Sequence, residues 1–295
     1  MSYNQIGTCR LYLNTIEWLD SLGSVAMPSD TFRTLPVNPT IQEVESIDIT
    51  LKGMTKYGFV ALLGHNMATT ATDFELQAGG IPIALTNVIN KDTSTGYNGF
   101  SIATFTGSDE IDNISVTNPL SSIGSIIIGT YFEFSTSPDL KLSLEYITGT
   151  KNITTKGGVD LSNTAWRPPL WNGLGPWELS DPSNQTNNQV LAHSSKRVFN
   201  LSFSFISKDK MFSKYNALNR LIDQNETVPD EETLLTSSDF FSAVWNRVGN
   251  SLPMILQPDN TVNEFAIVKI ANKSLKVTQV AHQVYTTKLK LVETF

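Results

Sequence analysis

The chain has 295 residues, of which 40% are hydrophobic and 17% charged, and its net charge is −7. This apolar content is enough for one large domain or two ordinary ones. The negative charge argues against sequence-specific nucleic-acid binding, which needs a basic face. No apolar stretch approaches the ~18 residues of a membrane-spanning helix. The single cysteine, Cys9, excludes an internal disulfide, and the N-terminus lacks the pattern of a secretory signal.

The apolar patterns in the first 150 residues predict a domain built from strands. Cys9, Leu11 and Leu13 alternate with polar residues, which is the pattern of a half-buried strand. The continuous apolar run at 59–63 predicts a strand buried on both faces. Further strands are predicted at 47–51, 74–76, 81–89, 100–105, 114–116, 125–135 and 140–148, with the last two joined into a hairpin through residues 136–139. This succession of short strands favours a β-sandwich of the jelly-roll type over residues 1–150.

Residues 151–195 predict a linker or arm without regular structure, because they are rich in Gly, Pro, Asn and Thr. This segment nevertheless holds three tryptophans, Trp166, Trp171 and Trp177, and a disordered linker would rarely carry so many. We interpret them as candidate interface anchors, packed at the junction of the two domains or against a neighbouring subunit. The alternative is that they stack on sugar rings.

Residues 196–295 predict an α+β module. Phe199, Leu201, Phe203 and Phe205 alternate along a strand that points one face into a core. Ser207 then caps a helix whose apolar stripe comprises Met211, Phe212, Tyr215, Leu218, Leu221 and Ile222. A second helix is predicted over 239–250, capped by Ser238, with an apolar face formed by Phe241, Val244, Trp245 and Val248. Four strands follow, at 252–257, 265–271, 275–281 and 284–295.

The residue types used in catalysis form no recognisable pattern in the sequence. His65, His193 and His282 are far apart and have no metal ligand at the usual spacing. No G-x-S-x-G elbow, P-loop or GxGxxG is present. The carboxylates in TGSDEIDN at 106–113 lack the spacing of a calcium loop. We therefore expect no enzyme activity, no catalytic residue, no cofactor and no metal; a hydrolase of cell-wall glycans has no positive support.

Several segments, taken in order, resemble a family of bacteriophage tail structural proteins. These are FVALLGHNM at 59–67, SSIGSIIIGTYFEFS at 121–135, WNGLGPWELSDPS at 171–183, KRVFNLSFSFISKDKMFSKYNALNRL at 196–221, LPMILQPDN at 252–260 and VYTTKLKLVETF at 284–295. Each segment is short, so the resemblance depends mainly on the order in which the segments occur. The chain departs from the family in having an insertion at 226–250 and in lacking the arginines that are usual near Ser125.

The resemblance implies a mainly β protein with an N-terminal galactose-binding-like jelly roll at 1–150, a linker or arm at 151–195 and a tail-tube-like or distal-tail-like module at 196–295. It implies a structural component of the virion, in the tail, baseplate or neck, that is assembled in the cytoplasm of the host bacterium. Its expected partners are copies of itself in a ring and other tail or neck proteins. The alternative function is a carbohydrate-binding module that attaches the particle to a host glycan.

Overall fold

The computed structural model describes residues 6–14, 42–44, 47–50, 56–65, 74–78, 81–82, 86–91, 99–107, 113–116, 121–123, 125–139, 143–148, 150–164, 195–212, 239–262 and 265–294. These residues form a mainly β structure in which antiparallel strands dominate and helices are few, as the sequence predicted. The finer division into a jelly roll and an α+β module stays a prediction.

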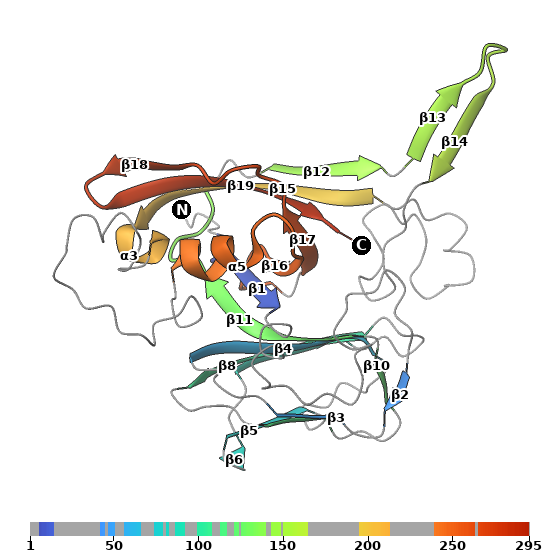
Figure 1. The fold of residues 1–295 in the computed structure, drawn as a ribbon. Helices are drawn as coiled ribbons and strands as arrows, with labels where there is room; N and C mark the ends of the chain where they lie inside the picture. Colours follow the sequence, from blue (N-terminus) through green and yellow to red (C-terminus); the bar gives the residue numbers. More distant parts are fainter. Residues whose placement is uncertain are drawn as a thin grey trace, which may run out of the picture.

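One sheet of eleven strands organises the described part of the chain (Figure 1). Ten strands follow one another across it, and β18 (Val277–Ala281) pairs with β19 beside this path. Their order is β12 (Ser143–Thr148), β15 (Ser195–Ser207), β19 (Val284–Glu293), β17 (Ala266–Ile270), β16 (Met254–Gln257), β1 (Arg10–Asn14), β11 (Ser125–Glu133), β4 (Lys56–His65), β8 (Gly99–Gly107) and β7 (Thr86–Lys91).

Three smaller sheets accompany it. The first has the strand order β3 (Ile47–Thr50), β9 (Asn113–Val116), β5 (Phe74–Ala78) and β6 (Ile81–Pro82). The second pairs β10 (Ser121–Ile123) with β2 (Gln42–Val44), and the third pairs β13 (Thr150–Thr154) with β14 (Asp160–Thr164). Figure 1 shows the first of these sheets below β4 and β8, whereas β13 and β14 project from the opposite side of the molecule.

Strand β1 lies at the middle of the large sheet and is buried on both faces. It pairs with β11 on one side and with β16 on the other, so strands from the first and last thirds of the chain share one sheet. Leu11 and Leu13 face a core that includes Phe134, Phe203 and many other apolar residues. Tyr12 points to the other face, into a core of Phe59, Ala61, Ile102, Ile127, Ile255 and Ile267.

The predicted hairpin between residues 125–135 and 140–148 is wrong. Strand β11 pairs with β1 and β4, whereas β12 pairs with β15. The chain between them crosses from one partner to the other: the Phe134 amide donates to Cys9 and the Asp139 amide to Ser202. Residues 136–139 therefore form a crossover between two strand pairs, since a local turn signal does not decide strand pairing, which depends on packing within the whole sheet.

The helix predicted over 239–250 is present, with its apolar face rotated. It consists of a π-helical turn, η4 (Phe241–Trp245), followed by α5 (Asn246–Val248). Phe240, Val244 and Val248 are fully buried, whereas Phe241 and Trp245 are half-buried. These three buried residues are four apart, so they lie along one side of the helix. The buried Asp239 carboxylate caps this helix by accepting from the Ser242 amide at 2.9 Å; Ser238 lies outside the described residues.

The helix predicted after Ser207 is described only over its first turn, α3 (Lys208–Met211), with Met211 buried in the core. Ser207 occupies the N-cap position but makes no capping hydrogen bond to the backbone. Phe212 already has an extended conformation, and Tyr215, Leu218, Leu221 and Ile222 lie outside the described residues. The helix therefore ends at Met211, and the prediction that Phe212 continues its apolar stripe is wrong.

One residue of β15 breaks the predicted alternation. Leu201 and Phe203 are buried as expected, but Phe205 is 74% exposed. A β-bulge between Phe203 and Ile206 inserts an extra residue into the pairing with β19, and Ile206 takes the inward position that Phe205 was predicted to hold. The prediction that Phe205 faces the core is thus wrong.

Candidate functional site

The residues singled out by sequence are not brought together in the described part of the chain. Trp166, Trp171 and Trp177 all lie outside it, as does His193. His65 is in β4, and His282 is exposed in the turn between β18 and β19. Among the described residues, no group of three or more His, Cys, Asp or Glu side chains could hold a metal ion. None of the described helices has the length and apolar character needed to cross a membrane.

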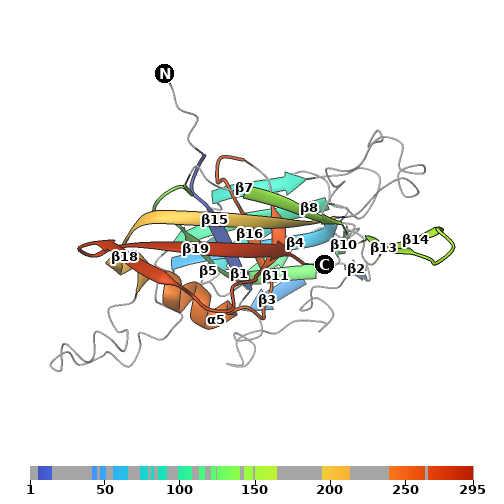
Figure 2. The ribbon, with the colours of Figure 1, turned by 90° about the horizontal axis from the view of Figure 1, so that it is seen from above.

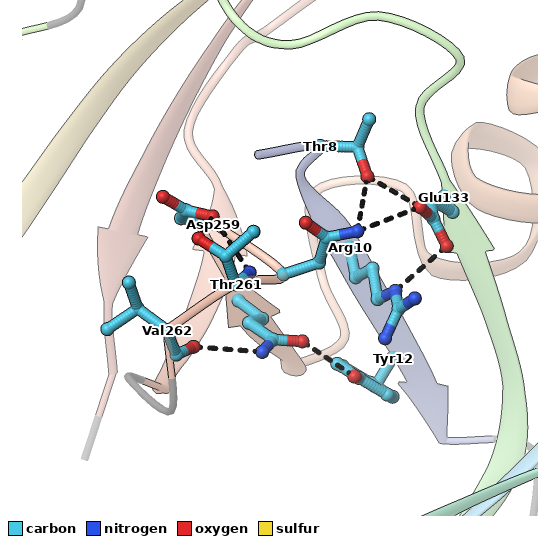
Figure 3. Close-up of polar contacts among 9 residues, drawn as sticks. Thr8, Arg10, Tyr12, Glu133, Asp259, Thr261 and Val262 are labelled. Carbon is cyan, nitrogen blue, oxygen red and sulfur yellow. Dashed lines mark hydrogen bonds and ion pairs between the residues drawn. The ribbon is translucent and has the colours of Figure 1, made fainter. Parts of the chain in front are cut away.

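A polar cluster joins the start of β1 to β11 and to the turn after β16 (Figure 3). The Glu133 carboxylate accepts from Arg10 Nε at 2.8 Å, from the Thr8 hydroxyl at 2.5 Å and from Asn260 Nδ2 at 3.1 Å. Asn260 also donates to the Thr8 hydroxyl at 2.8 Å. Because these groups satisfy one another, the cluster holds three chain segments in place and does not present a reactive group.

A second carboxylate, that of Asp259, holds the residues just before β1 in place. Asp259 Oδ1 accepts from the Gly7 amide at 3.0 Å and from the amide and hydroxyl of Thr261 at 2.8 and 2.6 Å. Its pKa is below the usual range: the desolvation of its partial burial acts to raise it, and the hydrogen bonds from Thr261 and Gly7 outweigh that effect. A Cβ at Gly7 would collide with the side-chain oxygens of Asp259 and Asn260, so a larger residue there would displace these hydrogen-bonded side chains.

Cys9, just before β1, and Tyr12, within it, are unsuited to catalysis. Burial raises the pKa of the Cys9 thiol, which keeps it protonated and a poor nucleophile. Burial also raises the pKa of the Tyr12 phenol to about 12, and this hydroxyl donates to Gln257 Oε1 at 2.8 Å. Gln257 in turn donates to the Val262 carbonyl at 3.0 Å, as Figure 3 shows. Both groups stabilise the centre of the sheet.

The described feature that best fits a function is the hairpin of β13 and β14, which we call the arm. It projects away from the large sheet in both ribbon views (Figures 1 and 2). Its two strands pair only with each other among the described strands, and residues 151–154 and 156–162 are all exposed. A two-stranded hairpin without a covered face is marginally stable in water, so a partner surface is expected to contribute to its stability.

The two faces of the arm differ in polarity. Ile153 lies directly opposite Leu161, so their side chains share one face. These residues and Val159 are 53%, 56% and 59% exposed. The other face carries polar pairs: Asn152 lies opposite Ser162, and Thr154 donates to the Asp160 carboxylate at 2.6 Å. Lys151, two residues before Ile153, lies on the same face, so the apolar surface is confined to the part of the arm nearest its tip.

The tip of the arm is a tight turn. The Gly158 amide donates to the Thr155 carbonyl at 2.9 Å, and the Thr155 amide donates to the Val159 carbonyl at 2.9 Å. Gly158 has φ of +80°, a conformation that glycine adopts at little cost. The Thr155 hydroxyl bonds both backbone groups of Val159 at 3.1 Å. These contacts fix the conformation of the turn and hold Val159 beside Thr155.

Sequence reasoning missed the arm. Residues 151–195 were predicted to lack regular structure, and this is wrong for their first part, which holds most of β13 and all of β14. The signal was present: the Lys-Gly-Gly turn at 156–158 lies between two five-residue strands, and glycine-containing turns between short strands are typical of hairpins. The tryptophans and prolines that follow this turn favour an irregular linker, and the prediction relied on them.

The comparisons with known proteins give no further assignment: no protein-family model, no curated protein and no solved structure matches this chain.

Proposed function

We propose that this protein is a structural component of a bacteriophage tail, in the tail, baseplate or neck, and that it acts by assembling with copies of itself and with neighbouring tail proteins. The observation that carries the proposal is the arm, which projects with Ile153, Val159 and Leu161 exposed on it. A subunit that assembles needs such an apolar surface, which becomes buried between chains.

Two further observations support this function. The ordered resemblance of six sequence segments to phage tail proteins gives the class of assembly. The polar groups around β1 are paired with one another and hold the sheet, which suits a protein whose role is mechanical. On this proposal the protein is not an enzyme, and it resides in the virion after assembly in the host cytoplasm.

The experiment that tests this function locates the protein in purified particles. A phage strain with a nonsense codon in the gene is grown in suppressor and non-suppressor hosts, and particles are banded in a density gradient. We expect the protein in the banded wild-type particles, immunogold label on the tail, and tail-defective particles from the non-suppressor host. Intact, infectious particles that lack the protein would contradict the proposal.

A further inference from the structure

Exposed apolar side chains gather where strand β12 meets the arm. β12 ends at Thr148 and the arm begins at Thr150, and Figure 1 shows the two next to each other. Of the eight large hydrophobic side chains that are exposed among the described residues, four lie in β12 or the arm: Ile147, Ile153, Val159 and Leu161. Apolar surface concentrated in this way marks a site that another protein surface covers.

Strand β12 lies at the edge of the large sheet. It pairs with β15 alone among the described strands, so its second edge has no described partner. Ser143, Glu145 and Ile147 alternate along β12 and are all exposed, which places them on one face of the sheet. Such an edge strand can receive an extended segment, which pairs with its backbone and places side chains beside those of the exposed face.

The arm and β12 carry opposite charges at matching positions. In β13, Lys151 and Ile153 are two residues apart and share a face. In β12, Glu145 and Ile147 have the same spacing and also share a face. Neither Glu145 nor Lys151 forms an ion pair with another described residue. The two strands therefore present the same arrangement of one charge and one isoleucine, with the sign of the charge reversed.

These charges select the arm of a second copy as the occupant of the β12 edge. Pairing of two arms would bring Lys151 near Lys151, and pairing of two β12 edges would bring Glu145 near Glu145; like charges on neighbouring strands are destabilising. An arm on β12 instead brings opposite charges together. The arm of the same chain cannot occupy this edge, since the single residue between Thr148 and Thr150 is too short for a hairpin turn.

A lipid bilayer is a poor alternative partner for the arm. The outer edges of β13 and β14 pair with no described strand. Their backbone groups would stay unpaired in hydrocarbon, where open sheet edges do not occur. A protein strand satisfies these groups by pairing with them.

We propose that two copies exchange arms, with β13 of each copy pairing antiparallel with the outer edge of β12 in the other. This inference rests on the proposed function and deepens it by naming the contact between copies. In each of two equivalent contacts, Lys151 of one copy lies near Glu145 of the other, and Ile153 lies near Ile147, since opposite and diagonal neighbours on one face of a sheet interact. Because β12 and the arm are contiguous, a two-fold axis relates the two contacts, and the interface closes as a dimer.

Charge reversal tests this exchange. Glu145→Lys places two lysines in each contact, and Lys151→Glu places two carboxylates there. Sedimentation equilibrium at low salt should give each variant a dimer dissociation constant at least about tenfold higher than that of the wild type. An equimolar mixture of the two variants should restore the wild-type constant, because each contact of the mixed dimer again joins a lysine to a carboxylate.

Lys156→Glu is the matched control. It makes the same charge change at an exposed residue in the turn of the arm, away from Glu145, and should leave the dissociation constant unchanged within about twofold. Circular dichroism spectra should match the wild type for all three variants, since the substituted residues are exposed.

Several results would overturn the inference. If only Lys151→Glu weakened the dimer, two arms would pair with each other; if only Glu145→Lys did so, two β12 edges would pair. A monomeric wild type, or a mixture that dimerises no better than the separate variants, would also exclude the exchange. None of these results bears on the particle experiment, so a protein found in the tail would retain the proposed function and lose only this contact.

Discussion

At the scale of single residues, Phe203 and Phe205 show how one bulge separates two roles. Phe203 is fully buried and stacks on Phe134 with ring centroids 3.7 Å apart, whereas Phe205 is 74% exposed. The alternation of the sequence predicted both residues on the core face. It could not place the bulge, because no glycine or proline marks it and the residue that replaces Phe205, Ile206, is equally apolar. The position is set by contacts with Asp139 and Thr286, which are distant in sequence.

Phe205 has φ of +62°, in the left-handed region that a bulky side chain rarely adopts, and removing this strain should stabilise the isolated subunit. Asn tolerates the left-handed region far better than Phe, so Phe205→Asn should raise the free energy of unfolding by about 1 kcal/mol. Urea denaturation at a concentration where the protein is monomeric measures this change. Phe205→Ala is the matched control: it removes the ring but lacks the short polar side chain that lets Asn adopt the left-handed region through local hydrogen bonds, so it should not give this gain. Equal stabilities of the Asn and Ala variants would show that the backbone is not strained.

At the scale of elements, the strands of the last hundred residues were predictable and their partners were less so. The runs around Ile255, Val268 and Leu289 form β16, β17 and β19 as expected, because each has the apolar pattern of a buried strand. Which strands pair with each other depends on how all the strands pack in the sheet. For this reason β12 pairs with β15 and not with β11. The sequence of the turn was enough to predict that the arm is a hairpin. Its exposure could not be predicted, because exposure depends on which other parts of the protein lie against the hairpin.

Strand β15 should tolerate a charge on only one face. Phe203→Asp places an unpaired carboxylate in the core and should cost roughly 3 kcal/mol or more in stability. Asn200→Asp adds the same charge to the outward face of the same strand, where Asn200 bonds the Ser143 hydroxyl at an exposed site, and should change stability by less than about 1 kcal/mol. Thermal unfolding followed by circular dichroism compares the two. A Phe203→Asp protein as stable as the wild type would disprove the core assignment.

At the scale of the whole molecule, β1 unites the two ends of the chain. Its Leu11 and Leu13 belong to one core and its Tyr12 to the other, so the first strand holds together regions that are more than a hundred residues apart. A sequence pattern shows that such a strand is apolar on both faces, but not that it lies between β11 and β16. The arm projects from one end of the resulting body.

If the arm mediates assembly, then removing it should lower the mass of the protein in solution. Sedimentation velocity should be compared between the wild type and a variant in which residues 151–163 are replaced by two glycines. We predict that the wild type sediments as a multi-subunit species and that the shortened variant sediments as a folded monomer. A wild type that stays monomeric at every concentration, or a shortened variant that assembles like the wild type, would contradict the account.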